Sequence, residues 1–368
     1  MSADDRRFMA MALALAERGL GNVWPNPAVG CVLVNDGRVV GRGWTQPGGR
    51  PHAESEAIDR AGAAARGSTA YVTLEPCVHH GRTPPCTDLM LASGIARIVV
   101  AAVDPDPRVD GRGIARLRAA GIPVALGCME AEAGRLNAGF FARIRRRRPL
   151  VALKLATSAD GRIATATGES QWITGPEARA EGHRLRLRHD AILVGSGTAL
   201  ADDPLLTCRL PGLEERSPVR VVLDRRLRLP PTSRLAVTAR GSGLWLFTRA
   251  PDVPRARLLR ESGVTLLGLP EGGPEVELAA MLATLAEQGI TRLLVEGGAE
   301  VATAFLRAGL VDRLYHFQAP ILLGADGAPA TGPLAVRTLG GTCRWQPVEQ
   351  RRLGTDRLWV LDAAAEEA

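Results

Sequence analysis

At 368 residues the chain has room for two domains of ordinary size. A hydrophobic fraction of 46% excludes a disordered chain, and no apolar run is long enough to cross a membrane. The formal net charge of +7 comes from scattered arginines, which favours a compositional bias toward arginine and argues against a nucleic-acid surface.

The first predicted element is a helix near the N-terminus. Met9, Leu13 and Ala16 recur at helical spacing and are followed by Gly19. Two acidic residues precede this apolar run, which is atypical of a secretory leader, so we expect a helix of the mature protein. We therefore expect a cytoplasmic protein, in which thiols stay reduced and clustered cysteines more often bind metal than form disulfides.

Strands and helices then alternate along the first half of the chain. They are expected as a hairpin at 28–42, a helix from His52, a buried strand at 69–76 that ends at Pro76, a helix at 87–94, a strand at 95–105, and a helix and strand within 113–126. This alternation predicts an open α/β sheet covered by helices. Functional side chains are expected where its strands end and its helices begin.

An arginine-rich segment at residues 143–149 precedes a fresh apolar strand, and we place a domain boundary there. The two predicted domains are residues 1–147 and 150–368. Strands and helices alternate again in the second domain, which predicts a mostly parallel sheet.

Four residues of the first domain have the types and spacing of a catalytic zinc site. His52 and Glu54 lie two residues apart at the start of a helix, and Cys77 and Cys86 lie on a later loop. One imidazole and two thiolates leave the fourth zinc position open for water, and Glu54 is then free to transfer protons. The pattern is that of the zinc deaminases of nucleobases, except that eight residues separate the two cysteines.

This long loop leaves room for His79 or His80 to compete as the third ligand, although prolines next to both cysteines favour Cys77 and Cys86. The structural alternative is that His52 caps a helix and the cysteines are small buried hydrophobic residues. Glu54 at the expected offset argues against that alternative, because a closed structural zinc site would take four protein ligands and no free carboxylate.

The motifs HAE, TLEPCVHHGRTPPC and PNPAVGCV together resemble the deaminase domain of the bifunctional riboflavin-biosynthesis deaminase/reductases. The resemblance implies a cytidine-deaminase-like α/β/α domain in which His52, Cys77 and Cys86 bind Zn²⁺ and Glu54 shuttles protons. The implied substrate is 2,5-diamino-6-(5-phosphoribosylamino)pyrimidin-4(3H)-one. Three further residues are expected to contact this substrate: Asn26 at the pyrimidine or sugar, and Arg82 and Thr83 at the ribose phosphate.

The second domain lacks a G-x-G-x-x-G fingerprint, but a buried strand meets Glu296-Gly297-Gly298 and turns into a helix. With SADGRIA, GESQWIT and GSGTALADDPLLTCR, this segment resembles the reductase domain of the same family. The resemblance implies a dihydrofolate-reductase-like fold that uses NADPH to reduce the ribosyl group. Its implied cofactor contacts are Ala156, Trp172, Thr198, Asp202 and Gly298, and its implied substrate contacts are Ser170, Arg186, Leu206, Arg209 and Glu296.

Reduction through an opened, imine-like form of the sugar needs a proton donor, and Lys154 and Asp202 are the candidates. Lys154 is the only lysine of the chain and lies in an apolar strand, where an ammonium group rarely lies without a partner. The alternative is a lysine whose stem packs on the protein while its charge reaches solvent. Arg225 stands where the family often has serine, and it either meets the additional phosphate of NADPH or points to solvent.

We therefore expect a homo-oligomeric enzyme with a small-molecule substrate and neither a nucleic-acid nor a membrane partner. One alternative is a deaminase of another nucleoside or of a tRNA base with a non-catalytic second domain. The other is a zinc-stabilised binding module.

Overall fold

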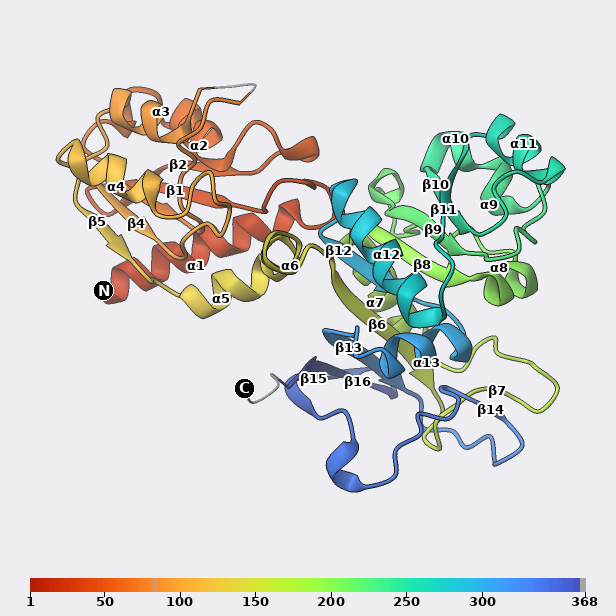
Figure 1. The fold of residues 1–368 in the computed structure, drawn as a ribbon. Coiled ribbons are helices and arrows are strands. Elements are labelled where there is room, and N and C mark those ends of the chain that lie inside the picture. The colour runs from red at the N-terminus through yellow and green to blue at the C-terminus, as the bar shows by residue number, and fades with distance from the viewer. Residues whose placement is uncertain (82–83, 365–368) are drawn as a thin grey trace. The chain divides into compact units, whose positions relative to one another are not determined.

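The computed structural model describes residues 1–81 and 84–364. The chain divides into two compact units, residues 1–148 and 149–368, which contain the red-to-yellow and the green-to-blue elements of Figure 1. Within the described residues, no helix is long and apolar enough to cross a membrane.

The first unit is built around a sheet with the strand order β2-β1-β3-β4-β5. Its strands are β1 (Gly30–Asn35), β2 (Arg38–Trp44), β3 (Thr69–Val72), β4 (Arg97–Val100) and β5 (Val124–Leu126). Its helices are α1 (Ala3–Ala16), α2 (Ala53–Ala61), α3 (Cys86–Ala92), α4 (Arg112–Ala119), α5 (Glu130–Leu136) and α6 (Ala138–Arg146). Strand β1 is antiparallel to both neighbours, whereas β3, β4 and β5 run parallel.

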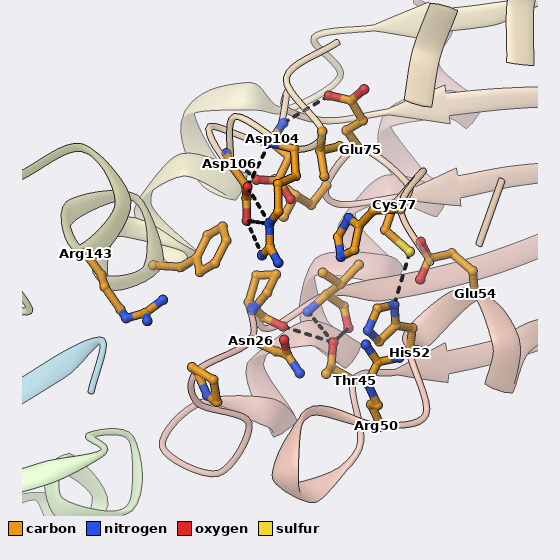
Figure 2. Close-up of a pocket in the computed structure, with 18 residues that line it drawn as sticks. Asn26, Thr45, Arg50, His52, Glu54, Glu75, Cys77, Asp104, Asp106 and Arg143 are labelled. Atoms are coloured by element: carbon orange, nitrogen blue, oxygen red, sulfur yellow. Dashed lines mark hydrogen bonds and ion pairs between the residues drawn. The ribbon is translucent and has the colours of Figure 1, made fainter. Parts of the chain in front are cut away.

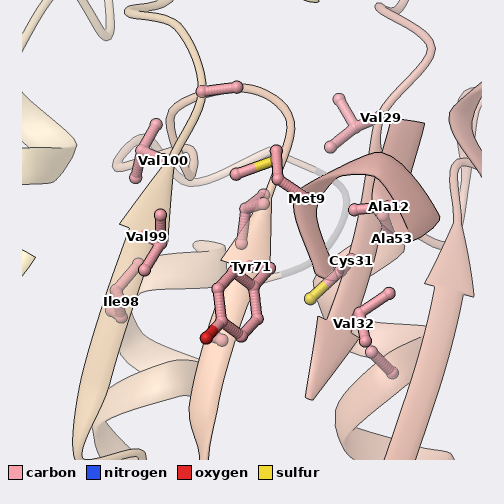
Figure 3. Packing of buried hydrophobic residues seen from close by; sticks show 14 of the residues in the cluster. Met9, Ala12, Val29, Cys31, Val32, Ala53, Tyr71, Ile98, Val99 and Val100 are labelled. Carbon is pink, nitrogen blue, oxygen red and sulfur yellow. The ribbon is translucent and has the colours of Figure 1, made fainter. Parts of the chain in front are cut away.

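The N-terminal helix forms where the sequence predicts it, because Ser2 and Asp5 cap it reciprocally through two hydrogen bonds of 3.0 and 2.9 Å. It packs so closely on β1 that a Cβ atom at Gly30 would lie 1.9 Å from the carbonyl oxygen of Ala12. Helix α2 packs on the opposite face against β2. Figure 3 shows the apolar side chains that fill this core, among them Met9 of α1.

The second unit is built around a larger sheet with the strand order β11-β10-β9-β8-β12-β6-β13-β16-β15. Its strands are β6 (Leu150–Thr157), β8 (Ala191–Gly195), β9 (Val219–Leu223), β10 (Leu244–Thr248), β11 (Val264–Gly268), β12 (Arg292–Val295), β13 (Arg313–Gln318), β15 (Trp345–Leu353) and β16 (Asp356–Ala363), and β7 (Arg162–Ala164) pairs with β14 (Ala328–Pro329) separately. Its helices are α7 (Pro176–Leu187), α8 (Ser196–Asp202), α9 (Arg234–Val237), α10 (Ala239–Ser242), α11 (Pro254–Glu261), α12 (Pro274–Glu287) and α13 (Ala299–Arg307).

The expected hairpin and the mostly parallel second sheet are confirmed, since β11 through β13 run parallel and only β16 and β15 are antiparallel. The strand expected at residues 69–76 is shorter than predicted and ends at Val72. Beyond it, the Thr73 hydroxyl accepts a hydrogen bond from the Gly30 amide, and Pro76 has no N–H to continue the ladder.

Candidate functional site

Three metal-binding side chains of the first unit meet at the ends of separate elements. His52 directly precedes α2, Cys77 lies on the loop after β3, and Cys86 is the first residue of α3. Their donor atoms all lie within 4.8 Å of one another, with His52 Nδ1 3.3 Å from Cys86 Sγ and 3.7 Å from Cys77 Sγ. This is the set of three residues that the sequence favoured, and neither His79 nor His80 belongs to it.

The surroundings of Cys77 suit a metal-binding thiolate. Its sulfur accepts a hydrogen bond of 3.3 Å from the backbone amide of Cys86, and its carbonyl accepts two from Thr87. The hydrogen bonds from Cys86 and His52 lower the pKa of the Cys77 thiol to about 4. Two cysteines and one histidine fit Zn²⁺, which prefers sulfur and nitrogen donors.

Glu54 lies in the first turn of α2 and lines the same cavity as His52 and Cys77 (Figure 2). Its side chain is buried, and burial raises the pKa of its carboxyl group. It is not part of the group of three donors. A raised pKa moves a carboxyl group toward the range in which an acid/base catalyst can both accept and return a proton.

The cavity has a volume of 180 Å³, and Asn26 lies in its wall between two prolines. The side-chain amide of Asn26 donates a hydrogen bond of 3.0 Å to the Gly49 carbonyl, which fixes its orientation. Thr45 steadies the same segment by accepting a hydrogen bond from the Val29 amide and donating one to the Pro27 carbonyl. The other two expected substrate contacts, Arg82 and Thr83, lie outside the described residues.

We expect Gly49→Ala to impair the deaminase half of the chain, and Gly48→Ala provides a matched control. Both glycines have positive φ, so both substitutions strain the backbone by about 1 kcal/mol. Only at Gly49 would the new Cβ collide with another residue, 1.9 Å from Asn26 Nδ2, whereas none lies within 4 Å at Gly48. Ammonia release should therefore fall only in Gly49→Ala, and equal losses in both variants would contradict the role of Asn26.

In the second unit, a charged cluster lies where β6 and β12 run side by side. Val295 pairs with Leu153, so the next residues along the two parallel strands, Glu296 and Lys154, are neighbours. Glu296 accepts two hydrogen bonds of 2.9 Å from Arg186, which lower the pKa of its carboxyl group to about 2 against the effect of burial. Burial lowers the pKa of Lys154, and the charge of Glu296 opposes that shift.

A second group of expected residues lies at the adjacent ends of β8 and β12. The Gly298 amide donates a hydrogen bond of 3.0 Å to Thr198 Oγ1, which joins the turn before α13 to helix α8. Glycine is needed next to it because a Cβ at Gly297 would lie 2.9 Å from the Val301 side chain. The backbone amides at the start of α13 can approach a phosphate here, so this turn fits a dinucleotide cofactor.

The remaining expected cofactor contacts are more dispersed. Ala156 follows Lys154 by two residues on β6 and faces the same side of the sheet. Trp172 is 62% exposed and stacks against the Arg179 guanidinium, and Asp202 ends α8 with an exposed side chain.

Comparison with known proteins connects both groups of residues to one family. The RibD C-terminal domain family matches residues 149–359, and the cytidine and deoxycytidylate deaminase zinc-binding region matches residues 2–102. The riboflavin biosynthesis protein RibD of Escherichia coli K12 is 44% identical over 363 residues, which cover 96% of this chain and 97% of that protein. This chain belongs to the RibD family.

RibD structures show the same two-part architecture. RibD of Acinetobacter baumannii (form 1) matches with a TM-score of 0.89 at 38% identity, covering 98% of this chain and 99% of that one. A deaminase/reductase from Thermotoga maritima matches with a TM-score of 0.87 at 36% identity over the same shares. The cytidine-deaminase-like and reductase folds are thereby confirmed, as is the resemblance stated from the sequence motifs.

As a RibD protein, the chain is a bifunctional enzyme of riboflavin biosynthesis that joins a zinc-dependent deaminase to an NADPH-dependent reductase. The alternative of a deaminase with a non-catalytic second domain is not favoured, because the RibD C-terminal domain family matches residues 149–359, which are most of that domain. The binding-module alternative is not favoured either, because residues 2–102 match the zinc-binding region of cytidine and deoxycytidylate deaminases and the chain belongs to an enzyme family.

The sequence did not reveal an acidic wall of the RibD deaminase cavity. Glu75 accepts hydrogen bonds from the backbone amides of Asp104, Gly111 and Ile114, at 2.9 to 3.3 Å, and so fixes the loop after β4. Asp104 lines the cavity, and burial raises the pKa of its carboxyl group to about 7. The sequence feature that could have indicated this wall is the position of both acids just beyond the ends of β3 and β4.

Nor did the sequence reveal the role of His183 on α7, which contacts an expected substrate residue. The backbone amide and Nε of Arg209 lie 3.3 and 3.4 Å from the two ring nitrogens of His183. Burial and nearby arginines lower the pKa of His183 to about 4, so the ring is neutral near pH 7. Leu206, also expected at the substrate, is buried with a positive φ of 56°, and Ser170 lies in the exposed segment before Trp172.

Proposed function

We propose that the deaminase acts on 2,5-diamino-6-(5-phosphoribosylamino)pyrimidin-4(3H)-one and that the reductase converts the ribosyl group of the product to ribityl. The observation that carries the proposal is that Glu54 lines one cavity with His52 and Cys77, two members of the donor group that Cys86 completes. The relative from Thermotoga maritima is described as a diaminohydroxyphosphoribosylaminopyrimidine deaminase and 5-amino-6-(5-phosphoribosylamino)uracil reductase, which supports this substrate and order of steps.

In the deaminase, His52, Cys77 and Cys86 hold the zinc ion, which when bound makes water acidic enough to lose a proton near neutral pH. Glu54 accepts that proton and delivers protons to the ring nitrogen and to the leaving ammonia. Water thus replaces the ring amine by oxygen. Asn26 offers both a donor and an acceptor to the pyrimidine or its sugar, and we assign Arg82 and Thr83 to the ribose phosphate.

In the reductase, NADPH when bound supplies a hydride to the sugar carbon of the opened, imine-like substrate. We assign to Lys154 the donation of the accompanying proton to nitrogen, because the lowered pKa of its ammonium group favours proton release. Asp202 is the second candidate donor, and its exposure makes it the weaker one. We assign Arg209 and Arg186, which Glu296 holds in place, to the substrate phosphate, and Glu296 to the sugar hydroxyls.

The remaining assignments complete this proposal. The cofactor is assigned to Ala156, Trp172, Thr198, Asp202 and Gly298, and the reductase substrate also to Ser170 and Leu206. We assign the deaminase to residues 1–147 and the reductase to residues 150–368. We further propose a homo-oligomer in the cytoplasm without a nucleic-acid partner, where a reducing environment keeps Cys77 and Cys86 available for zinc.

Removal of zinc should separate the two activities. A chelator is expected to abolish ammonia release from the diaminopyrimidine nucleotide, while NADPH oxidation with the deaminated intermediate continues. Ammonia and NADPH absorbance report the two steps, and circular dichroism monitors the fold. Loss of both steps in a folded protein would contradict the assignment of separate sites, and no ammonia release from the untreated enzyme would contradict the substrate.

A further inference from the structure

Helix α7 holds the short segment that carries Arg209. The carbonyl of Thr207 accepts a hydrogen bond of 2.9 Å from Arg186 Nη1. The thiol of the next residue, Cys208, lies 3.7 Å from the carbonyl oxygen of His183, which precedes Arg186 by one helical turn. The backbone amide of Arg209 then donates a hydrogen bond of 3.3 Å to His183 Nδ1. Three successive residues are thus fixed to two positions of one helix.

His183 also contacts the guanidinium group of Arg209, because its Nε2 lies 3.4 Å from Arg209 Nε. Within residues 1–81 and 84–364 this guanidinium has no other hydrogen-bond partner, so its two terminal nitrogens remain available. Both groups that face the ring are N–H donors, and an imidazole protonated on both nitrogens could accept from neither. Burial and the charges of Arg186 and Arg209 lower the pKa of His183 to about 4, so the ring is neutral near pH 7. One ring nitrogen is therefore an acceptor for Arg209.

The uncharged ring leaves the positive charge of Arg209 intact. Arg186 is held differently, by two hydrogen bonds to the carboxylate of Glu296, which also lies beside Lys154. Three cationic side chains and one carboxylate give the group of Lys154, Arg186, Arg209 and Glu296 a net charge of +2. A phosphate monoester carries a charge of roughly −2 at neutral pH, which matches this group. A carboxylate in the place of His183 would cancel one of the positive charges.

We infer that His183 is the positioning residue of Arg209, and that it aims the terminal nitrogens of this arginine at the phosphate of the reductase substrate. It holds the arginine by the inner nitrogen of the guanidinium and needs no contact with substrate or cofactor. Fixing a long side chain before the substrate arrives reduces the ordering cost of binding, which strengthens the contact of a guanidinium with phosphate. This inference rests on the proposed assignment of Arg209 to the substrate phosphate.

Steady-state kinetics with the deaminated intermediate test the inference. His183→Phe keeps a ring at this position and removes the acceptor nitrogen. It should raise the KM for the intermediate about tenfold, the effect of one hydrogen bond to a charged group, while kcat and the KM for NADPH stay near normal. His183→Gln restores an acceptor oxygen and should recover most of the loss. Ammonia release, which the other domain performs, should not change in either variant.

Two comparisons separate positioning from a general loosening of the fold. The dephosphorylated intermediate offers Arg209 no phosphate, so His183→Phe should turn it over as the unmodified enzyme does. In the double variant with Arg209→Gln, the KM for the phosphorylated intermediate should match that of Arg209→Gln alone, because His183 acts only through the arginine.

Arg184→Gln is the matched control. Arg184 is the next residue of α7 and forms an exposed ion pair of 3.0 Å with Glu181, which also pairs with Arg351. Its replacement should leave kcat and both KM values near normal.

Should His183→Phe fail to fold by circular dichroism, His183→Ala removes the same acceptor without a new ring and takes its place. The inference alone would be overturned by an unchanged KM in a folded variant without the acceptor, by an equal loss with the dephosphorylated intermediate, or by losses that multiply in the double variant. A normal KM for the phosphorylated intermediate in Arg209→Gln would instead overturn the proposed phosphate site.

Discussion

Glu54→Gln is expected to stop ammonia release while the enzyme keeps its zinc and its fold. The amide has nearly the shape of the carboxyl group but can neither accept the proton of water nor return one to the leaving ammonia. Acid/base groups of this kind contribute roughly 10²- to 10⁴-fold to the rate, so deamination should fall by that factor. Metal analysis should still find zinc, because Glu54 is not one of the three grouped donors.

Glu56→Gln is the matched control for this prediction. Glu56 is an acid on the same helix, two residues further on, and it forms an ion pair of 2.7 Å with Arg60 on the protein surface. Its replacement should cost little stability and leave deamination intact. Near-normal ammonia release by Glu54→Gln would remove the acid/base assignment. Loss of zinc from that variant would instead make Glu54 part of the metal site.

The zinc site could be predicted from the sequence because its residues lie at short, characteristic spacings along the chain. His52 and Glu54 are separated by one residue at a helix start, and the two cysteines bracket one short loop. The interatomic distances agree with that prediction. The alternation of strands and helices predicted both sheets for a similar reason, since periodicity and turn residues are properties of short segments.

The features that the sequence did not reveal depend on contacts between distant segments. Glu75 and Asp104 become one acidic wall only because β3 and β4 pair in parallel and bring their ends together. In the sequence, Asp104 resembles an ordinary turn residue.

Glu277 likewise resembles a surface acid in the first turn of a helix. Its burial between Arg225 and Arg249, 52 and 28 residues away, follows from the order of the strands. Arg225 therefore does not simply extend into solvent, because Glu277 holds its Nε atom.

Lys154→Met is expected to impair reduction and leave deamination unchanged. Methionine preserves the length and apolar stem of the side chain but removes its ammonium group, so the packing on Phe317, whose ring centre lies 5.6 Å from Nζ, is largely kept. A lost proton donor lowers a rate by roughly 10²-fold or more, and NADPH oxidation with the deaminated intermediate should fall accordingly. NADPH binding should change much less than the rate.

Leu155→Met distinguishes loss of the charge from the insertion of methionine into β6. Leu155 is the next residue of the strand and faces the other side of the sheet, so its replacement should leave both activities near normal. The position of Lys154 beside Glu296 gives the experiment a further readout. In Lys154→Met, Glu296 keeps its ion pair with Arg186, so the charge balance of the cluster changes by one while that pair remains. An unchanged reduction rate in this variant would show that the lysine only packs.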